Sequence, residues 1–208
     1  MYKVDSLIFD LDGTLWDSRD EIIICWSMVL DQYPEIHKVV TREELNSNLG
    51  RPLTEIARRM FPDQPEQLRQ KLMAMCADYE NEYLAVHGAT LYPKLIETVK
   101  KLGEKITLYV VSNCQDGYIQ SFYSGHDTKK YFKDFECIGR TGLSKGENIR
   151  LVMQRNNLKA PAYVGDTQGD ADAAGFAQIP FIYARYGFGE VDGYDMVIDE
   201  FEDLLKLV

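Results

Sequence analysis

Near its start the chain reads Val4-Asp5-Ser6-Leu7-Ile8-Phe9-Asp10-Leu11-Asp12-Gly13-Thr14. Residues 4–9 are rich in apolar, β-branched and aromatic side chains, which predicts a short buried strand. Asp10 and Asp12 follow this strand directly, although aspartate is a poor strand former and is seldom buried without a partner. Gly13 lets the backbone turn sharply. Because open α/β sheets bind ligands at the carboxyl ends of their strands, we expect both carboxylates at such an edge; the alternative is a solvated Asp-Gly turn.

The second half of the chain alternates predicted helices and strands. Apolar runs predict strands at residues 106–111, 135–138, 162–164, 179–183 and 196–198. Helical patterns are expected at residues 93–102, 116–123, 145–156, 170–177 and 201–207. Strict alternation predicts a parallel sheet with helices on both faces, which is a doubly wound α/β fold.

Between the first strand and this alternating part, the sequence predicts only helices. Apolar residues recur at helical spacing over residues 22–30, Thr41-Arg42-Glu43-Glu44 reads as a capping box, and further helices are expected at residues 53–60 and 65–86. The sequence Asn48-Leu49-Gly50-Arg51-Pro52 predicts a break between two of them. We therefore expect a core domain of residues 1–16 and 87–208, with a small all-helical domain, residues 17–86, inserted after the first strand.

The composition restricts the partners of this chain. Its 23 Lys and Arg residues against 33 Asp and Glu residues give a formal net charge of −10, which opposes binding to nucleic acid. No apolar run is long enough to span a membrane and no signal-peptide pattern is present, so we expect a cytoplasmic protein with no membrane partner. The four cysteines are widely spaced, which favours free thiols over a zinc site.

Chemically reactive side chains follow four of the predicted strands. Besides Asp10 and Asp12, these are Ser112 with Asn113, then Lys145 in the next loop, and finally Asp166 with Asp170. A parallel sheet brings such strand ends to one edge. Four carboxylates that share a site repel one another and need a cation, and their oxygen atoms suit Mg²⁺. The metal would also give an acidic chain the local positive charge that phosphate requires.

These residues, in this order, resemble the four signatures of the haloacid dehalogenase superfamily, and the resemblance covers essentially the whole chain. Asp10-Leu11-Asp12-Gly13-Thr14 matches the first signature, Ser112 the second, Lys145 the third, and Gly165-Asp166 with Asp170 the fourth. Asp12 is informative because the true dehalogenases of the superfamily lack an acid there, whereas its phosphatases and phosphomutases have one. The helical insert resembles the helical cap of the phosphoglycolate phosphatase-like and β-phosphoglucomutase-like branch.

The resemblance implies a role for each acid. Asp10 is expected to be a nucleophile that forms an aspartyl-phosphate, and Asp12 a general acid and base. Thr14 is expected to orient Asp12 and to lie in the phosphate site. Mg²⁺ is expected to be held by Asp10, the main-chain carbonyl of Asp12, and Asp166, with Asp170 behind them or reaching the metal through water.

Two further strand ends complete the expected phosphate site. Lys145 lies in the first turn of a helix opened by the capping box Ser144-Lys145-Gly146-Glu147, where the helix dipole disfavours a cation by roughly 0.3–1 kcal/mol. An inward Lys145 beside Asp10 and phosphate would gain more than that. The Ser112 hydroxyl and backbone amides near Asn113 are expected to bind phosphate oxygens.

The predicted helical domain offers one candidate for substrate recognition. Gly50 and Pro52 can fix a tight turn that leaves Arg51 projecting over the carboxyl edge of the sheet. There its planar guanidinium could bind a second anionic group of the substrate. Alternatively Arg51 is a solvated residue, or Arg58 or Arg59 takes this part.

The sequence thus predicts a Mg²⁺-dependent phosphomonoester hydrolase of phosphoglycolate phosphatase type that acts on a small phosphorylated metabolite. A phosphomutase of β-phosphoglucomutase type is the enzymatic alternative, and a non-catalytic binding protein on the same fold is the alternative from another class. The sequence leaves open whether the substrate is phosphoglycolate, a sugar phosphate or a nucleoside monophosphate, and it does not predict the oligomeric state.

Overall fold

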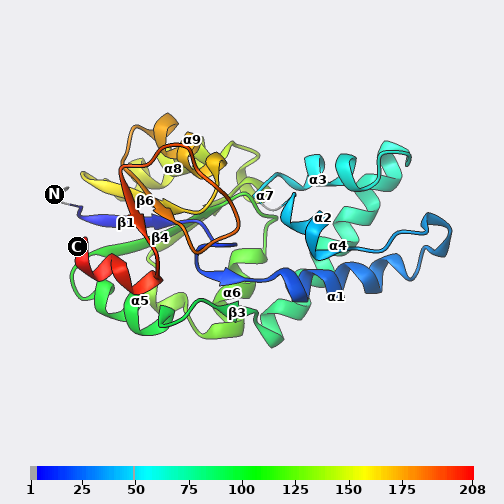
Figure 1. Cartoon of the computed structure of the whole chain (residues 1–208), viewed down its shortest axis with the longest axis horizontal. Coiled ribbons are helices and arrows are strands. Elements are labelled where there is room, and N and C mark those ends of the chain that lie inside the picture. Colours follow the sequence, from blue (N-terminus) through cyan, green and yellow to red (C-terminus); the bar gives the residue numbers. More distant parts are fainter. Residues whose placement is uncertain (1–3, 49) are drawn as a thin grey trace.

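The computed structural model describes residues 4–48 and 50–208, so residues 1–3 and Leu49, in the predicted break, lie outside the described part of the chain. The chain forms an α/β core and an elongated helical insert beside it (Figure 1). The core contains one six-stranded sheet in which every neighbouring pair is parallel. Its strands, in spatial order, are β5 (Asp134–Cys137), β4 (Thr107–Ser112), β1 (Ser6–Phe9), β6 (Pro161–Gly165), β7 (Phe181–Ala184) and β8 (Met196–Ile198).

Helices cover both faces of this sheet, which confirms the doubly wound α/β fold. The main core helices are α5 (Leu95–Gly103), α6 (Tyr118–His126), α8 (Lys145–Asn156) and α9 (Gln168–Ala177). Shorter elements are η2 (Lys129–Tyr131), α7 (Ile138–Thr141) and η3 (Phe201–Lys206). The last of these is a 3-10 helix where the sequence predicted an ordinary helix, and α7 was not predicted.

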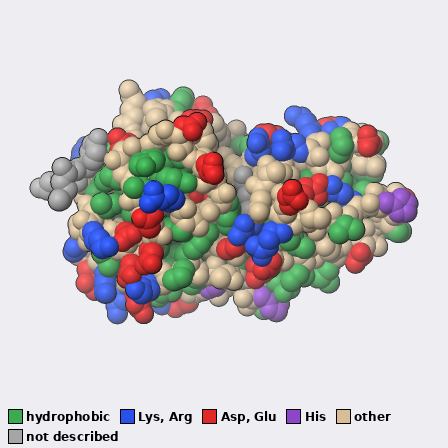
Figure 2. Space-filling model, viewed as in Figure 1, with side chains coloured by type: hydrophobic (Ala, Val, Ile, Leu, Met, Phe, Trp, Pro, Cys, Tyr) green, Lys and Arg blue, Asp and Glu red, His purple; other side chains and the backbone are tan. Residues whose placement is uncertain are grey.

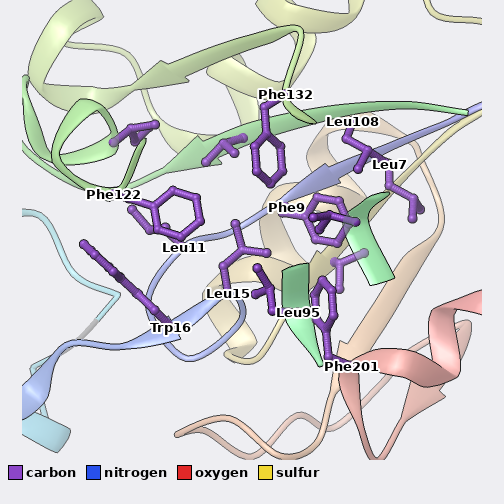
Figure 3. Packing of buried hydrophobic residues seen from close by; sticks show 14 of the residues in the cluster. Leu7, Phe9, Leu11, Leu15, Trp16, Leu95, Leu108, Phe122, Phe132 and Phe201 are labelled. Carbon is purple, nitrogen blue, oxygen red and sulfur yellow. The ribbon is translucent and has the colours of Figure 1, made fainter. Parts of the chain in front are cut away.

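The central strand β1 divides the core into two apolar layers. Leu7 and Phe9 belong to the cluster that also contains residues of α5, α6 and η3, and Figure 3 shows Phe9 between Phe132 and Phe201. Ile8 belongs to the cluster on the other face, with residues of α8 and α9. Since side chains alternate along a strand, Asp10 continues on the face of Ile8, toward α8 and α9.

The insert has an apolar cluster of its own, separate from those of the core. Its helices are α1 (Arg19–Leu30), η1 (Pro34–Ile36), α2 (Arg42–Asn46), α3 (Leu53–Met60) and α4 (Glu66–His87). Thr41 caps α2 by accepting a hydrogen bond from the backbone N–H of Glu44, as predicted. We expected only helices from Asp17 onward, but Asp17 itself belongs to a strand. There β2 (Trp16–Asp17) pairs antiparallel with β3 (Thr90–Leu91), a ribbon too short to leave a periodic pattern.

Helix α4 runs from the insert onto the core, where it packs along α6 (Figure 1). Asn81 donates a hydrogen bond to the carbonyl of Asp116 (2.8 Å), and the Ser121 hydroxyl donates to the carbonyl of Asn81 (2.8 Å). Leu84 is already part of the core cluster. The C-terminal half of α4 therefore fixes one side of the insert to the core.

The surface, the cysteines and one histidine complete the description of the fold. No helix in the two described segments combines the length and the apolar character needed to cross a membrane. On the face in view in Figure 2, basic side chains are interspersed with acidic ones. The four cysteines are free and buried. His126 is half-buried and accepts a hydrogen bond from the backbone N–H of Ala89 (3.1 Å).

Replacing Phe9 tests the packing of the central strand. Phe9→Ala should lower the free energy of unfolding by about 3–5 kcal/mol, because it removes a fully buried ring and leaves a cavity beside the reactive strand end. Phe176→Ala is the matched control, since that ring is 49% exposed, and should cost less than about 1 kcal/mol. Urea unfolding followed by tryptophan fluorescence measures both, and equal losses would contradict the assignment of Phe9 to the core.

Candidate active site

Three aspartates that follow two neighbouring strands meet at the carboxyl edge of the sheet. Asp10 follows β1, Asp166 follows β6, and Asp170 lies in the first turn of α9. One carboxylate oxygen from each lies within 4.8 Å of the others, and all three side chains are buried. We call these residues the three-acid cluster. The order of the strands explains it, because β1 and β6 are neighbours at the centre of the sheet.

Lys145 is the cation of this cluster. Its Nζ lies 3.0 Å from Oδ1 of Asp10 and 2.6 Å from Oδ1 of Asp170. The capping box between Ser144 and Glu147 starts α8 and so places Lys145 in its first turn, as expected. Burial acts to lower the pKa of Lys145, but the charges of Asp10 and Asp170 outweigh it and raise the pKa above its ordinary value. Lys145 therefore keeps its charge inside the site.

Asp170 binds both Lys145 and the loop that follows β6. Its Oδ2 accepts hydrogen bonds from the backbone N–H groups of Asp166 (3.1 Å) and Thr167 (2.9 Å) and from the Thr167 hydroxyl (2.7 Å). Its Oδ1 accepts from Lys145. With both oxygens so engaged, Asp170 is better suited to support the site from behind than to bind an ion directly.

Asp166 is oriented by two donors. Its Oδ2 accepts from the backbone N–H of Phe188 (2.7 Å) and its Oδ1 from the Thr14 hydroxyl (3.3 Å). The expectation that Thr14 orients Asp12 was therefore wrong, because the turn directs this hydroxyl across to Asp166. Gly13 makes that turn with φ +80°, and a Cβ there would lie 2.2 Å from Oδ2 of Asp166. Only glycine satisfies both the turn and the close approach.

Asp12 lies apart from the three-acid cluster and is surrounded by hydrogen-bond donors. Its Oδ1 accepts from Trp16 Nε1 (2.8 Å), the Ser18 hydroxyl (2.6 Å) and the Tyr118 hydroxyl (3.0 Å). Burial raises the pKa of Asp12, and these hydrogen bonds oppose the rise only in part. Sequence reasoning missed all three donors. Trp16 and Ser18 stand within six residues of Asp12 and could have been considered, whereas Tyr118 is 106 residues away.

Asp10 has the environment of a ligand or a nucleophile. Burial raises the pKa of Asp10 to about 7, although the charge of Lys145 and the hydroxyl of Ser112 both act to lower it. Its buried Oδ1 makes no hydrogen bond with the described residues and faces Lys145 only as an ion pair. Together with Asp166, it offers buried carboxylate oxygens of the kind that bind a hard divalent cation. The residues present therefore fit such an ion.

The remaining two predicted residues lie where the insert meets the core. The Asn113 side chain donates to the carbonyl of Gly50 (3.0 Å), so it links the two parts rather than pointing at the three-acid cluster. Arg51 lines a cavity of about 40 Å³ that begins at Asp12. However, its guanidinium pairs with Glu55, and its Nε donates to the carbonyl of Ser47 (3.3 Å).

We call the cavity that Asp12 and Arg51 line the junction cavity. It lies between α1, the 50–56 segment, α4 and the segment after β4, which supply most of its lining. Its lining residues are Asp12, Ile22, Trp26, Leu45, Gly50, Arg51, Leu53, Ile56, Glu80, Asn113, Cys114, Gln115 and Tyr118. Neither Glu80 nor Gln115 was expected there.

The family of the chain follows from comparison with known proteins. A model of the haloacid dehalogenase-like hydrolases matches residues 7–184. The chain belongs to this family. The phosphoglycolate phosphatase of Vibrio parahaemolyticus is 26% identical over 224 residues, which cover 99% of this chain and 96% of that protein. The phosphoglycolate phosphatase of Salmonella typhi is 24% identical over 241 residues, with 99% and 92% covered.

Solved structures share the fold of this hydrolase. A protein from Haemophilus somnus, described as a predicted phosphoglycolate phosphatase, has a TM-score of 0.85 at 21% identity, with 100% of this chain and 99% of that chain covered. The protein CbbY from Rhodobacter sphaeroides, solved with phosphate, has a TM-score of 0.82 at 16% identity, with 97% and 96% covered. Membership of this family makes the chain an enzyme of the hydrolase class, and the relatives from Vibrio and Salmonella are named as phosphatases.

Removing one acid of the three-acid cluster tests the ion site. Asp166→Asn keeps the shape of the side chain but removes its charge, so it should weaken Mg²⁺ binding at least about tenfold. Calorimetric titration measures this affinity, and Mg²⁺ should raise the unfolding temperature of the unchanged protein more than that of the variant. Asp172→Asn, an exposed acid on the same helix as Asp170, should change neither. Equal affinities for all three proteins would place the ion elsewhere.

Proposed function

We propose that this hydrolase is a Mg²⁺-dependent phosphatase that cleaves a small phosphomonoester through an aspartyl-phosphate intermediate. The observation that carries the proposal is that Asp10 and Asp12, separated only by Leu11, have different surroundings. Asp10 lies beside Lys145 and Asp166, whereas Asp12 is held away from them by Trp16, Ser18 and Tyr118. Two carboxyl groups in such different surroundings can serve as nucleophile and as acid.

Asp10 would act first. A carboxylate oxygen of Asp10 attacks the phosphorus, the ester O–P bond breaks, and the phosphoryl group is carried on Asp10. Lys145 faces the attacking group and a bound phosphate with its positive charge, and the Ser112 hydroxyl can bind a phosphate oxygen. Mg²⁺ held by Asp10, Asp166 and the Asp12 carbonyl would supply the charge that lets a phosphate dianion approach these acids.

Asp12 would donate a proton to the leaving group and then accept one from water. Because burial favours its neutral form, Asp12 can carry the proton that the departing alkoxide oxygen requires. It then takes a proton from the water that cleaves the aspartyl-phosphate and so returns to its starting state. Its three donors fix the direction in which it faces, toward the junction cavity.

The junction cavity agrees with a small leaving group. A volume of about 40 Å³ corresponds to only about three water molecules. The relatives are named for phosphoglycolate, whose leaving group has two carbon atoms. Phosphoesters with two-carbon leaving groups are therefore the first substrates to assay. The insert would serve as a cap that excludes water from this space.

Replacing the proposed nucleophile tests the reaction. Asp10→Asn should lower kcat by at least about a thousandfold, because an amide cannot form the phosphoryl intermediate, while substrate still binds. Release of inorganic phosphate from acetyl phosphate and from 2-hydroxyethyl phosphate measures turnover, and mass spectrometry excludes deamidation. Near-normal turnover by the variant would contradict the mechanism. Transfer of the phosphoryl group to a second hydroxyl instead of water would indicate a phosphomutase.

A change at Tyr118 tests the role of Asp12. Tyr118→Phe removes one of the three donors to Asp12, so kcat for 2-hydroxyethyl phosphate should fall about tenfold. Acetyl phosphate should be affected less than about twofold, because acetate leaves without a proton. Tyr123→Phe is the control on the same helix, since the buried Tyr123 hydroxyl makes no hydrogen bond with the described residues. Equal losses on both substrates would remove Asp12 from the acid role.

A further inference from the structure

Glu80 is a buried acid that the mechanism above does not use. It lies on α4, is 3% exposed, and lines the junction cavity together with Asp12. Its Oε1 accepts a hydrogen bond from the indole N–H of Trp26, and its Oε2 accepts from the Gln115 side chain (2.9 Å). These two donors come from α1 and from the segment after β4, so the position of the Glu80 carboxyl is fixed from two sides.

No cation in the described part of the chain balances this acid. Within the described residues, no Lys or Arg nitrogen lies within ion-pairing distance of Glu80. Arg51 is the basic residue of the cavity lining, but it is paired with Glu55 and is 42% exposed, so its charge is already offset and screened by water. Burial raises the pKa of Glu80 to about 8, which the hydrogen bond from Gln115 opposes only in part.

We propose that Glu80 is a specificity-determining residue that recognises the far end of the leaving group and favours an ammonium or hydroxyl group over a carboxylate. The inference rests on the proposed phosphatase function, because it concerns the group that departs from the phosphate. The inference adds to the proposed function the chemical class of the leaving group.

The position of Glu80 along the cavity supports this assignment. A leaving group whose ester oxygen lies at Asp12 must extend into the junction cavity, where Glu80 is the other buried acid. Much of the remaining wall is apolar, formed by residues such as Ile22, Leu53 and Ile56, and suits a methylene chain. A hydrogen-bond donor at the end of that chain therefore finds its partner in Glu80.

The charges of the cavity point the same way. An ammonium or hydroxyl group would donate to a carboxyl oxygen of Glu80, and an ammonium would also supply the missing counter-charge. A bound ammonium would hold Glu80 in its charged form. A carboxylate would instead meet an acid with no neutralising basic side chain in the lining, because Arg51 is paired with Glu55, and like charges repel. Such juxtaposition of like charges is a common means of rejecting a wrong ligand.

A purely structural role for Glu80 makes a different prediction. Its hydrogen bonds to Trp26 and Gln115 hold α1 and α4 against the core, so its loss could loosen the insert. Asn81, the next residue, also fixes α4 to the core through the carbonyl of Asp116 but does not line the junction cavity. Loosening alone would affect all substrates alike, and Asn81→Ala would reproduce it.

Three phosphoesters with two-carbon leaving groups test the proposal. Phosphoethanolamine ends in an ammonium, 2-hydroxyethyl phosphate in a hydroxyl, and 2-phosphoglycolate in a carboxylate. We expect kcat/KM of the unchanged protein to be higher for the first two than for the third by about tenfold. Glu80→Gln keeps the length of the side chain and removes its charge, and should reduce this ratio about tenfold, mainly through KM. Asn81→Ala should leave the ratio unchanged.

The outcomes separate this proposal from the proposed function. Preference of the unchanged protein for 2-phosphoglycolate, or a ratio that Glu80→Gln alters by less than about threefold, overturns the role of Glu80. Acetyl phosphate, which carries neither end group, reports the phosphatase reaction itself. If no substrate is hydrolysed, the proposed function fails. Calorimetric titration of the unchanged protein and of Glu80→Gln with phosphoethanolamine and with 2-phosphoglycolate then still measures which end group is preferred. If Glu80→Gln does not fold, Glu80→Met replaces it in both measurements.

Discussion

The ion pairs of Lys145 with Asp10 and Asp170 hold the site together. They join the central strand to the first turns of α8 and α9, so the edge of the sheet and two helices depend on one buried charge. Removing one member of a buried ion network leaves its partners uncompensated, at a cost of about 3–5 kcal/mol. The geometry of the site and the stability of the core are therefore coupled through the same three side chains.

This network also explains why Asp10 and Asp12 differ. Asp10 lies on the face of the sheet that meets α8 and α9, so it belongs to the acids around Lys145. The chain bends at Leu11 and turns again at Gly13, and Asp12 between them lies among the donors of β2, Ser18 and α6. Two acids separated by one residue thus have separate surroundings, and the junction cavity begins at the second acid.

Much of the core and of the acid cluster could be predicted from the sequence, because local signals specify them. The buried strand before Asp10 and the capping box before Lys145 are short-range patterns, and parallel pairing of strands brings their ends together. Contacts across elements leave no such signal: Tyr118 of α6 reaches Asp12 from 106 residues away, and Glu80 reaches Gln115 where α4 packs along α6. The pairing of Arg51, which precedes α3, with Glu55 in the first turn of that helix is an exception, since the two residues are only four apart in the sequence.

The balance of charge at the strand ends shows what the proposed metal ion would contribute. The carboxyl groups of Asp10, Asp12, Asp166 and Asp170 outnumber the one buried lysine among them. Burial raises the pKa of Asp10 and, together with the charges of Asp170 and Asp10, the pKa of Asp166, so both carboxyl groups hold protons more readily than free aspartate. A divalent ion would compete with these protons for the same oxygens, so its binding would release protons and weaken as the pH falls. In a chain that is acidic overall, such an ion would also supply the positive charge that a phosphate dianion needs to approach Asp10.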